Sequence, residues 1–298
     1  MKILLPVDLV HPIEPTIDLL NALCDLSQHS VHLLYVRELL PAYENVIKTS
    51  GSFVDDWEKK LESKAREHLS EFLQKLKPHC QSISIEVASG TVAATIAAVA
   101  ADEGHDLIVV APGQHPLSER LLSGSVTGRL LDHAPCPILV GRPSSNATDR
   151  LSNVLIGYDG SENARIAIEG AAKIFRVAGA QAKVTVVHSV DVAEPVKFLS
   201  PVEFVASIEQ NLLMAGETYL ATAEKILYDH NIKKVDCCLI EGDPATGLLK
   251  MAADISADLI VLGAHGHGSV ADFLLGSVSH KVAMNAHCSV AVVKRQRD

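Results

Sequence analysis

Aromatic residues are scarce in this chain of 298 residues: Phe, Tyr and Trp together make up 4% of it, whereas apolar residues make up 48%. The cores must therefore be aliphatic, which is typical of parallel sheets that are covered by helices. No run approaches the ~20 apolar residues of a membrane span, and the N-terminus lacks the apolar region of a secretory signal. We therefore expect a cytoplasmic protein, and the length predicts two domains of about 150 residues each.

Patterns that hold metals or form disulfides are missing as well. The six cysteines show no C-x-x-C spacing, and the 14 histidines show no H-x-x-x-H spacing. We expect buried, reduced thiols and no metal site; His265 and His267 are interpreted as loop histidines, although Mg²⁺ could accompany a bound nucleotide. The net charge of −10 argues against a general nucleic-acid or anionic-membrane binder.

The chain does contain an internal duplication. Four blocks recur in the same order at an offset of 151 or 152 residues: 2–8 with 153–159, 106–110 with 258–262, 124–127 with 276–279, and Cys136 with Cys288. A repeat of this length is a duplicated domain. We predict an N-terminal domain over 1–142, a polar linker over 143–152 and a C-terminal domain over 153–298.

Both copies alternate short apolar runs with helical patterns, which predicts an α/β fold with a parallel sheet and right-handed crossovers. In the second copy we expect strands at 153–158, 183–190, 235–241, 258–263 and 289–294, and helices at 163–177, 201–229 (with a break near Gly216), 245–255 and 277–285. In the first copy we expect strands near 2–7, 31–36, 82–87, 106–111 and 137–141, and a long helix over about 53–77.

A candidate ligand site lies in the second copy, where polar and glycine-rich segments follow the predicted strands. Asp159 follows the first strand, Ser189 is near the end of the second, Gly242–Pro244 follows the third, and Gly263–Ser277 follows the fourth. Ligands of open parallel sheets bind beyond the carboxyl ends of the strands, where the strand order reverses. These four segments are therefore expected to converge.

The last of them reads G-x₂-G-x₉-G-S, from Gly263 and Gly266 to Gly276 and Ser277. Gly263 and Gly266 are expected to allow positive φ and the close approach of an anion, and the helix that begins near Ser277 offers unpaired N–H groups and a positive dipole end. A P-loop is excluded because no lysine precedes Ser277. No Lys or Arg lies inside the segment, so we expect slow hydrolysis at most and no catalytic residues.

This frame, with an Asp after the first strand, resembles the ATP-binding universal stress protein family (UspA-like), and the likeness covers the chain twice. The resemblance implies two tandem Rossmann-like domains of the adenine nucleotide alpha hydrolase type, each with a five-stranded parallel sheet, and ATP as the cofactor, with or without Mg²⁺. It implies that Asp159 and Ser189 lie on the adenosine side. It also implies contacts to phosphate and ribose from the loop and the helix start, namely Gly263, Gly266, Gly276, Ser277, Val278 and Ser279.

The first copy departs from the pattern. Asp8, Val36, Gly124 and Ser125 match it, but Ala111 and Gln114 stand at the first two glycine positions, and Pro112 between them has no N–H. We predict a degenerate N-terminal site that binds ATP much more weakly than the C-terminal one, or not at all.

Two functions stay open at this stage. One is an ATP-binding stress-response or signalling protein, in which the nucleotide acts as a sensor signal for an unknown protein partner. The other is a non-nucleotide scaffold for interaction or dimerisation, with another ligand in the N-terminal pocket; an enzyme would require multiple turnovers. The apolar runs Pro137–Val140 and Val290–Val293 are expected to pair the two domains within the chain, and the sequence leaves homodimerisation undecided.

Overall fold

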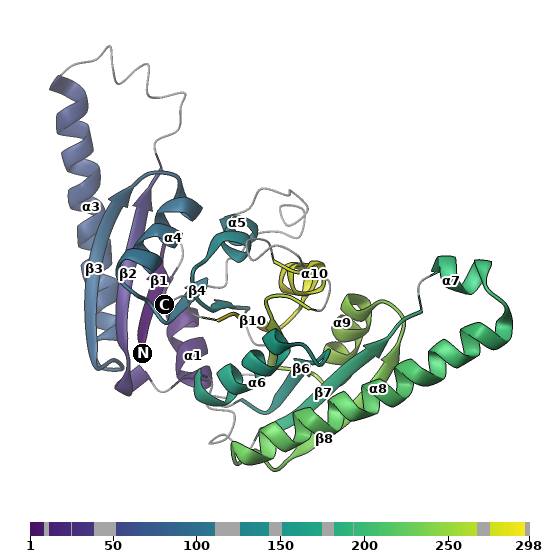
Figure 1. Ribbon diagram of the computed structural model, residues 1–298. Coiled ribbons are helices and arrows are strands. Elements are labelled where there is room, and N and C mark those ends of the chain that lie inside the picture. The colour runs from purple at the N-terminus through teal and green to yellow at the C-terminus, as the bar shows by residue number, and fades with distance from the viewer. Residues whose placement is uncertain are drawn as a thin grey trace. The chain divides into compact units, whose positions relative to one another are not determined.

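The structure is a computed structural model that describes residues 1–8, 12–24, 26–38, 52–110, 126–142, 151–174, 182–192, 194–266 and 275–295, with the backbone alone over 52–58. The chain forms two compact units, the first made of nearly all of Met1–Gly141 and the second of nearly all of Arg142–Arg295 (Figure 1). The predicted boundaries of the domains and linker stay a prediction at the level of single residues.

The second unit alternates strands and helices. Its elements are β6 (Asn153–Gly157), α6 (Glu162–Ile174), β7 (Lys183–Val190), α7 (Glu194–Leu199), α8 (Val202–Asp229), β8 (Val235–Glu241), α9 (Pro244–Asp254), β9 (Leu259–Gly263), α10 (Ser277–Asn285) and β10 (Ser289–Val293). Its strands lie in the order β8-β7-β6-β9-β10, and all neighbours are parallel. The order therefore reverses between β6 and β9, which share an edge of the sheet where a ligand can bind.

The first unit repeats this plan. Its elements are β1 (Lys2–Pro6), α1 (Glu14–Leu23), the 3₁₀ turn η1 (Leu26–Gln28), β2 (Ser30–Arg37), α3 (Ser52–Leu76), β3 (Ser82–Ser89), α4 (Val92–Asp102), β4 (Leu107–Val110), α5 (Val126–His133) and β5 (Ile138–Val140). The parallel strand order is β3-β2-β1-β4-β5. The prediction of an α/β fold with five parallel strands in each unit is confirmed.

Helices cover both faces of the second sheet because right-handed crossovers that move in opposite directions place their helices on opposite faces. Helices α6 and α8 contact each other on one face, and α9 and α10 contact each other on the other. In Figure 1, α8 lies along β7 and β8. All residues of β9 and β10 are buried, so the core of this unit is aliphatic, as the shortage of aromatics predicts.

The aspartates at the start of the 106–110 and 258–262 blocks have a structural role that is the same in both units. Asp106 accepts a hydrogen bond from the backbone N–H of Lys2 at 2.7 Å, and Asp258 accepts one from Asn153 at 2.8 Å. Each carboxylate thus joins the start of the fourth strand to the start of the first. This contact explains why the Asp recurs before a buried strand.

Helix α8 differs from its prediction, because it runs unbroken through Gly216. A Cβ at this position would lie 2.7 Å from Leu239 Cδ2 and 2.8 Å from His188 Cδ2. The glycine is therefore needed for close packing of the helix on the sheet and does not break the helix. The short helix α7, just before α8, was not predicted.

None of the six cysteines is joined in a disulfide, and they are not all buried. Cys24, Cys136 and Cys288 are buried, whereas Cys237 is exposed, which corrects the expectation for that residue. Burial raises the pKa of the Cys288 thiol to about 12. Within the described residues, none of the helices combines the length and apolarity that crossing a membrane requires.

Candidate functional site

A cavity of about 600 Å³ opens at the carboxyl edge of the second unit's sheet, between the ends of β6 and β9. This volume suits a small organic ligand, since such pockets measure roughly 300–1,000 Å³. Every residue that the resemblance assigns to the cofactor lines it: Asp159, Ser189, Gly263, Gly266, Gly276, Ser277, Val278 and Ser279. The structure thus brings the predicted residues together, although their role in binding stays a prediction; His267 lies outside the described residues.

The start of helix α10 forms one wall of the cavity. Gly276 is its N-cap residue and has no side chain that could cap the helix. The N–H of Gly276 donates to the carbonyl of Ala264 at 2.8 Å. The N–H groups of Ser277, Val278 and Ser279 belong to the first turn, where a helix has no internal acceptors for them. They give this wall the partial positive charge of a helix N-terminus. Ser277 is the first helical residue and does not cap the helix.

The three glycines of the frame are required for space and not for positive φ. None of them has a φ in the left-handed region, so that expectation is wrong. A Cβ on Gly263 would lie 2.7 Å from the backbone of Asn163, and one on Gly276 would lie 3.2 Å from the carbonyl oxygen of Ala264. A Cβ on Gly266 would overlap the carboxylate of Asp159.

Asp159 stands where the chain leaves β6. Its Oδ1 accepts the N–H of Ser161 at 3.0 Å, and the hydroxyl of Ser161 accepts the N–H of Ala164 at 3.2 Å at the start of α6. The bond from the Ser161 N–H holds the carboxylate at the start of α6, and its Oδ2 is directed toward Gly266 on the cavity wall. A fixed carboxylate at this point can accept hydrogen bonds from a ligand hydroxyl or amine.

The opposite wall is formed by β7 and the residues near it. The hydroxyl of Ser189 donates to the carbonyl of Gly242 at 2.6 Å, so this side chain already has an acceptor and a ligand would meet mainly the backbone. His188 Nδ1 donates to the carbonyl of Tyr158 at 2.8 Å, and the His188 ring meets Tyr219 edge-on at 5.3 Å. The ring is thereby held in one orientation.

Other residues complete the lining of this wall. His188 lies beside Ser189 at the strand end that the sequence predicts to converge on the site, and it lines the cavity. Sequence reasoning missed Tyr158 and the aliphatic side chains from β7, α9, β9 and the segment before α10: Val187, Leu248, Leu262 and Leu275. The neighbour Asp159 could have indicated Tyr158. Leu248 gave no signal, because it reads as an ordinary apolar position of a helix. These aliphatic side chains make this part of the lining apolar.

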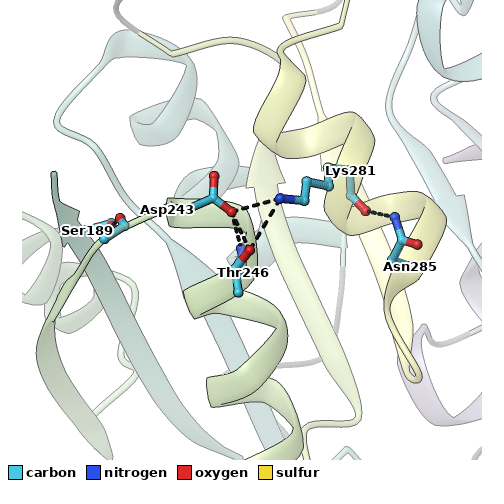
Figure 2. A network of polar contacts seen from close by, with 6 residues as sticks. Ser189, Asp243, Thr246, Lys281 and Asn285 are labelled. Atoms are coloured by element: carbon cyan, nitrogen blue, oxygen red, sulfur yellow. Dashed lines mark hydrogen bonds and ion pairs between the residues drawn. The ribbon is translucent and has the colours of Figure 1, made fainter. Parts of the chain in front are cut away.

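A polar network joins α9 to α10 beside the cavity (Figure 2). Asp243 caps α9, accepts the N–H of Thr246 at 2.9 Å and also accepts its hydroxyl. Lys281 of α10 donates to the same carboxylate at 2.8 Å, and Asn285 Nδ2 donates to the Lys281 carbonyl at 2.7 Å. The hydrogen bonds from Lys281 and then Thr246 lower the pKa of Asp243 to about 2. Lys281 is thus bound to Asp243 outside the cavity.

The charges around the cavity come from few groups. Among the described lining residues there is no Lys or Arg, and the acidic group is Asp159. The N-terminus of α10 adds backbone N–H groups and the positive end of a helix dipole, a combination that can bind anions.

The equivalent site of the first unit is described only in part. Asp8 follows β1 as Asp159 follows β6, and Val36 is a buried residue of β2. The substituted positions Ala111 and Gln114, and the pair Gly124 and Ser125, lie outside the described residues. The weaker N-terminal site stays a prediction.

Comparison with known proteins gives the same result for each half. The model described as "Universal stress protein family" matches residues 1–142 and 151–294. The Thermus aquaticus protein named "Universal stress protein in QAH/OAS sulfhydrylase 3'region" is 34% identical over 141 residues, which cover 47% of this chain and 97% of that protein. Universal stress protein MJ0531 of Methanocaldococcus jannaschii is 31% identical over 154 residues, which cover 51% of this chain and 87% of that protein. Each relative corresponds to one repeat.

A solved structure matches both repeats together. A universal stress protein from Archaeoglobus fulgidus DSM 4304 aligns over 100% of this chain and 97% of its own, with a TM-score of 0.70 and 22% identity. This likeness shows the fold. A universal stress protein solved in complex with cAMP aligns with 49% of this chain at 22% identity and a TM-score of 0.39, and that ligand is a property of that protein.

Proposed function

The chain belongs to the universal stress protein family as a tandem of two such domains, and from this premise we propose that it is an ATP-binding regulator whose nucleotide occupies the cavity of the second unit. Binding changes the availability of the protein for a partner, and any hydrolysis is slow. The observation that carries the proposal is one cavity wall that combines Asp159, the glycine frame and the N-terminus of α10.

The two ends of the cavity match the two ends of a nucleotide. The first turn of α10 offers N–H groups and a positive dipole end to phosphates. The side chains of Val187, Leu248 and Leu262 offer an apolar surface to the base, and the carboxylate of Asp159 offers an acceptor to ribose hydroxyls or the adenosine side. The absence of lining lysines and arginines among the described residues supports a sensor over a fast ATPase.

Several finer statements belong to the same proposal. We keep the domain boundaries 1–142 and 153–298, a cytoplasmic location and Mg²⁺ as a companion of ATP. The scaffold function remains the second candidate, because Ala111, Pro112 and Gln114 interrupt the glycine frame of the first unit. In that case the first unit serves as a docking or dimerisation module while the second holds the nucleotide.

Calorimetric titration of ATP into the full chain tests the proposal. Asp159→Asn keeps the bond to the Ser161 N–H but removes the charge, and Gly266→Ala displaces the carboxylate with a single methyl group. A hydrogen bond to a charged group contributes about 1.5–3 kcal/mol, so either variant should weaken ATP roughly 10- to 100-fold. Gly263→Val is a poorer choice, since its side chain would meet the backbone of Asn163.

Asp8→Asn is the matched control, because Asp8 holds the same place after the first strand of the other unit. It should leave the main ATP affinity unchanged. Absence of ATP binding by the wild type would disprove the proposal, as would equal losses in Asp8→Asn and Asp159→Asn. Heat release of ligand from protein purified without added nucleotide gives a second reading, since a pure scaffold would release no adenine absorbance.

A further inference from the structure

Three side chains with metal-binding groups meet in the first unit, near the amino ends of its strands. Asp8 follows the carboxyl end of β1, so it lies at the other end of the strands. His32 lies on β2, Glu103 follows the last turn of α4, and His105 lies in the turn before β4. Each offers one ligand atom, and these atoms lie within 4.8 Å of one another. They come from separate elements, so spacing along the sequence gave no sign of the cluster.

The distances in this cluster are those between ligands of one metal ion. His32 Nδ1 lies 3.2 Å from His105 Nε2 and 3.4 Å from Glu103 Oε2. Two ligand atoms bound to Zn²⁺ at about 2.0–2.1 Å with a tetrahedral angle lie roughly 3.3–3.4 Å apart. The arrangement therefore needs little movement to close around an ion.

A fourth residue orients the first histidine. The other nitrogen of His32, Nε2, lies 3.3 Å from the carboxylate of Glu86 on β3. Because a carboxylate only accepts hydrogen bonds, it favours the tautomer with a proton on Nε2 and a lone pair on Nδ1. A carboxylate that holds the outer nitrogen of a ligating histidine in this way is a regular feature of zinc sites.

In this tautomer the Nδ1 lone pair of His32 faces the carboxylate of Glu103 and accepts the hydrogen bond from His105 Nε2. A metal ion that replaced the shared proton would be bound by His32, Glu103 and His105 at once. Lys2 donates to Glu103 Oε2 at 2.6 Å and lies at the edge of the cluster, so it would share this carboxylate with the ion.

The surroundings suit ligation by neutral imidazoles. His32 and His105 are 4% and 1% exposed, and their rings stack with centroids 5.2 Å apart. Glu103 is exposed, so an ion can enter from its side and retain a water molecule at a fourth position.

We propose that the first unit binds one divalent transition-metal ion of the Zn²⁺ type through His32 Nδ1, His105 Nε2 and the Glu103 carboxylate, with Glu86 orienting His32. Imidazole and carboxylate ligands suit Zn²⁺, and three protein ligands leave one coordination position open. The ion would join β2 to the turn between α4 and β4, at the edge of the sheet away from the strands' carboxyl ends.

The second unit supplies an internal comparison. Strand registers place Thr185 at the position of His32, and Cys238 at that of Glu86. The helix ends and strand starts place Ile255 and Ala257 at the positions of Glu103 and His105. The same fold is thus built without these ligands, and Thr185 and Ala257 are buried there. His32→Thr and His105→Ala are therefore substitutions that this architecture accommodates.

Equilibrium dialysis of the full chain against Zn²⁺, in a reductant that does not bind metals, measures the stoichiometry, and visible absorption of added Co²⁺ reports a tetrahedral site. We expect one tightly bound ion per chain and a thermal unfolding midpoint that rises with Zn²⁺ concentration. The His32→Thr/His105→Ala variant, folded by circular dichroism, should lose the ion, the Co²⁺ spectrum and the Zn²⁺-dependent rise.

Two milder variants and a control complete the test. Glu103→Gln alters an exposed ligand and should weaken Zn²⁺ without unfolding the protein, and Glu86→Gln should weaken it about 10- to 100-fold. His68→Ala removes a surface histidine 3.9 Å from a carboxylate of α3 and should change nothing. Absence of Zn²⁺ binding by the wild type, or undiminished binding by the double variant, would overturn the proposal.

Discussion

At the residue scale, the hydroxyl of Ser279 ties the end of β9 to the first turn of α10. It donates to the carbonyl of Gly263 at 2.6 Å, and Ser279 is buried. The bond spans the two ends of the glycine frame, so it holds the cavity wall in shape whether or not a ligand is bound. The wall is thus built in advance of binding, which reduces the ordering cost of binding.

Ser279→Ala should therefore destabilise the folded protein. It removes the hydrogen bond and leaves the Gly263 carbonyl without this donor, which costs about 1–2 kcal/mol. Urea unfolding followed by circular dichroism measures the change in free energy. Ser277→Ala, at the exposed neighbouring position, should stay within about 0.5 kcal/mol of the wild type; similar losses in both variants would contradict the assigned role.

At the element scale, the contact between α9 and α10 beside the cavity depends on one carboxylate. Asp243 accepts from the first turn of its own helix and from Lys281 of the next. The Lys281 bond is exposed to solvent and screened by salt, so it contributes little by itself. Its importance is positional, because it connects the helix that carries Pro244 to the helix whose N-terminus faces the cavity.

This contact predicts a pH dependence of stability. The pKa of Asp243 is lowered to about 2 in the folded protein, below the ~3.9 of an unfolded Asp. A lowered pKa means that the stabilisation is complete above about pH 4 and is lost as the pH falls toward 2. Asp243→Asn, which still caps a helix, should be less stable than the wild type at pH 6.

The gap in unfolding free energy between this variant and the wild type should narrow below about pH 4, and added salt should narrow it at pH 6 as well. Denaturant titrations at a series of pH values follow both effects. A gap that stays constant between pH 6 and pH 2.5 would show that the charge of Asp243 does not stabilise the fold.

The sequence predicted the elements with a clear period well and the contacts between elements poorly. Strands β7 and β8 and helix α10 begin and end at the residues that their apolar patterns predicted. The unbroken α8 was missed, because the need for Gly216 arises from His188 and Leu239 across the packing interface. The His32 cluster was missed for the same reason: its members meet only once the first unit is folded.

The glycine frame shows again that the sequence predicts elements better than the contacts between them. Its residues line one cavity, near strand ends and a helix start that follow from periodicity. The positive φ expected at 263 and 266 was wrong, and the steric space that glycine leaves beside Asn163 and Asp159 is a property of the packed unit. Sequence patterns assign residues to strands and helices, whereas steric contacts depend on which residues pack against them in the folded unit.

At the scale of the whole molecule, one fold has been used twice with different surroundings at the same positions. Asp8 and Asp159 follow equivalent strands, and Val7 and Tyr158 donate equivalent backbone hydrogen bonds, to Leu34 and Val187 at 2.9 Å. The frames that follow the fourth strands differ: the first has Ala111, Pro112 and Gln114, and the second has Gly263, Ala264 and Gly266. Equivalent positions after the fourth strands of the two units thus carry different residues.

The full chain should accordingly bind one equivalent of ATP. In the second unit the N–H of Ala264 donates to the carbonyl of Val293 at 3.0 Å, a bond that Pro112 cannot form at the equivalent position because it has no N–H. The variant Ala111→Gly/Pro112→Ala/Gln114→Gly rebuilds the frame of the second copy in the first. We expect the number of ATP molecules that this variant binds per chain, measured by calorimetry, to rise from about one toward two. As a control, Asp159→Asn added to this variant should remove only the original site in the second unit. A wild-type stoichiometry of two would show that the first frame is competent as it stands, and that these three substitutions did not cost the first unit its nucleotide.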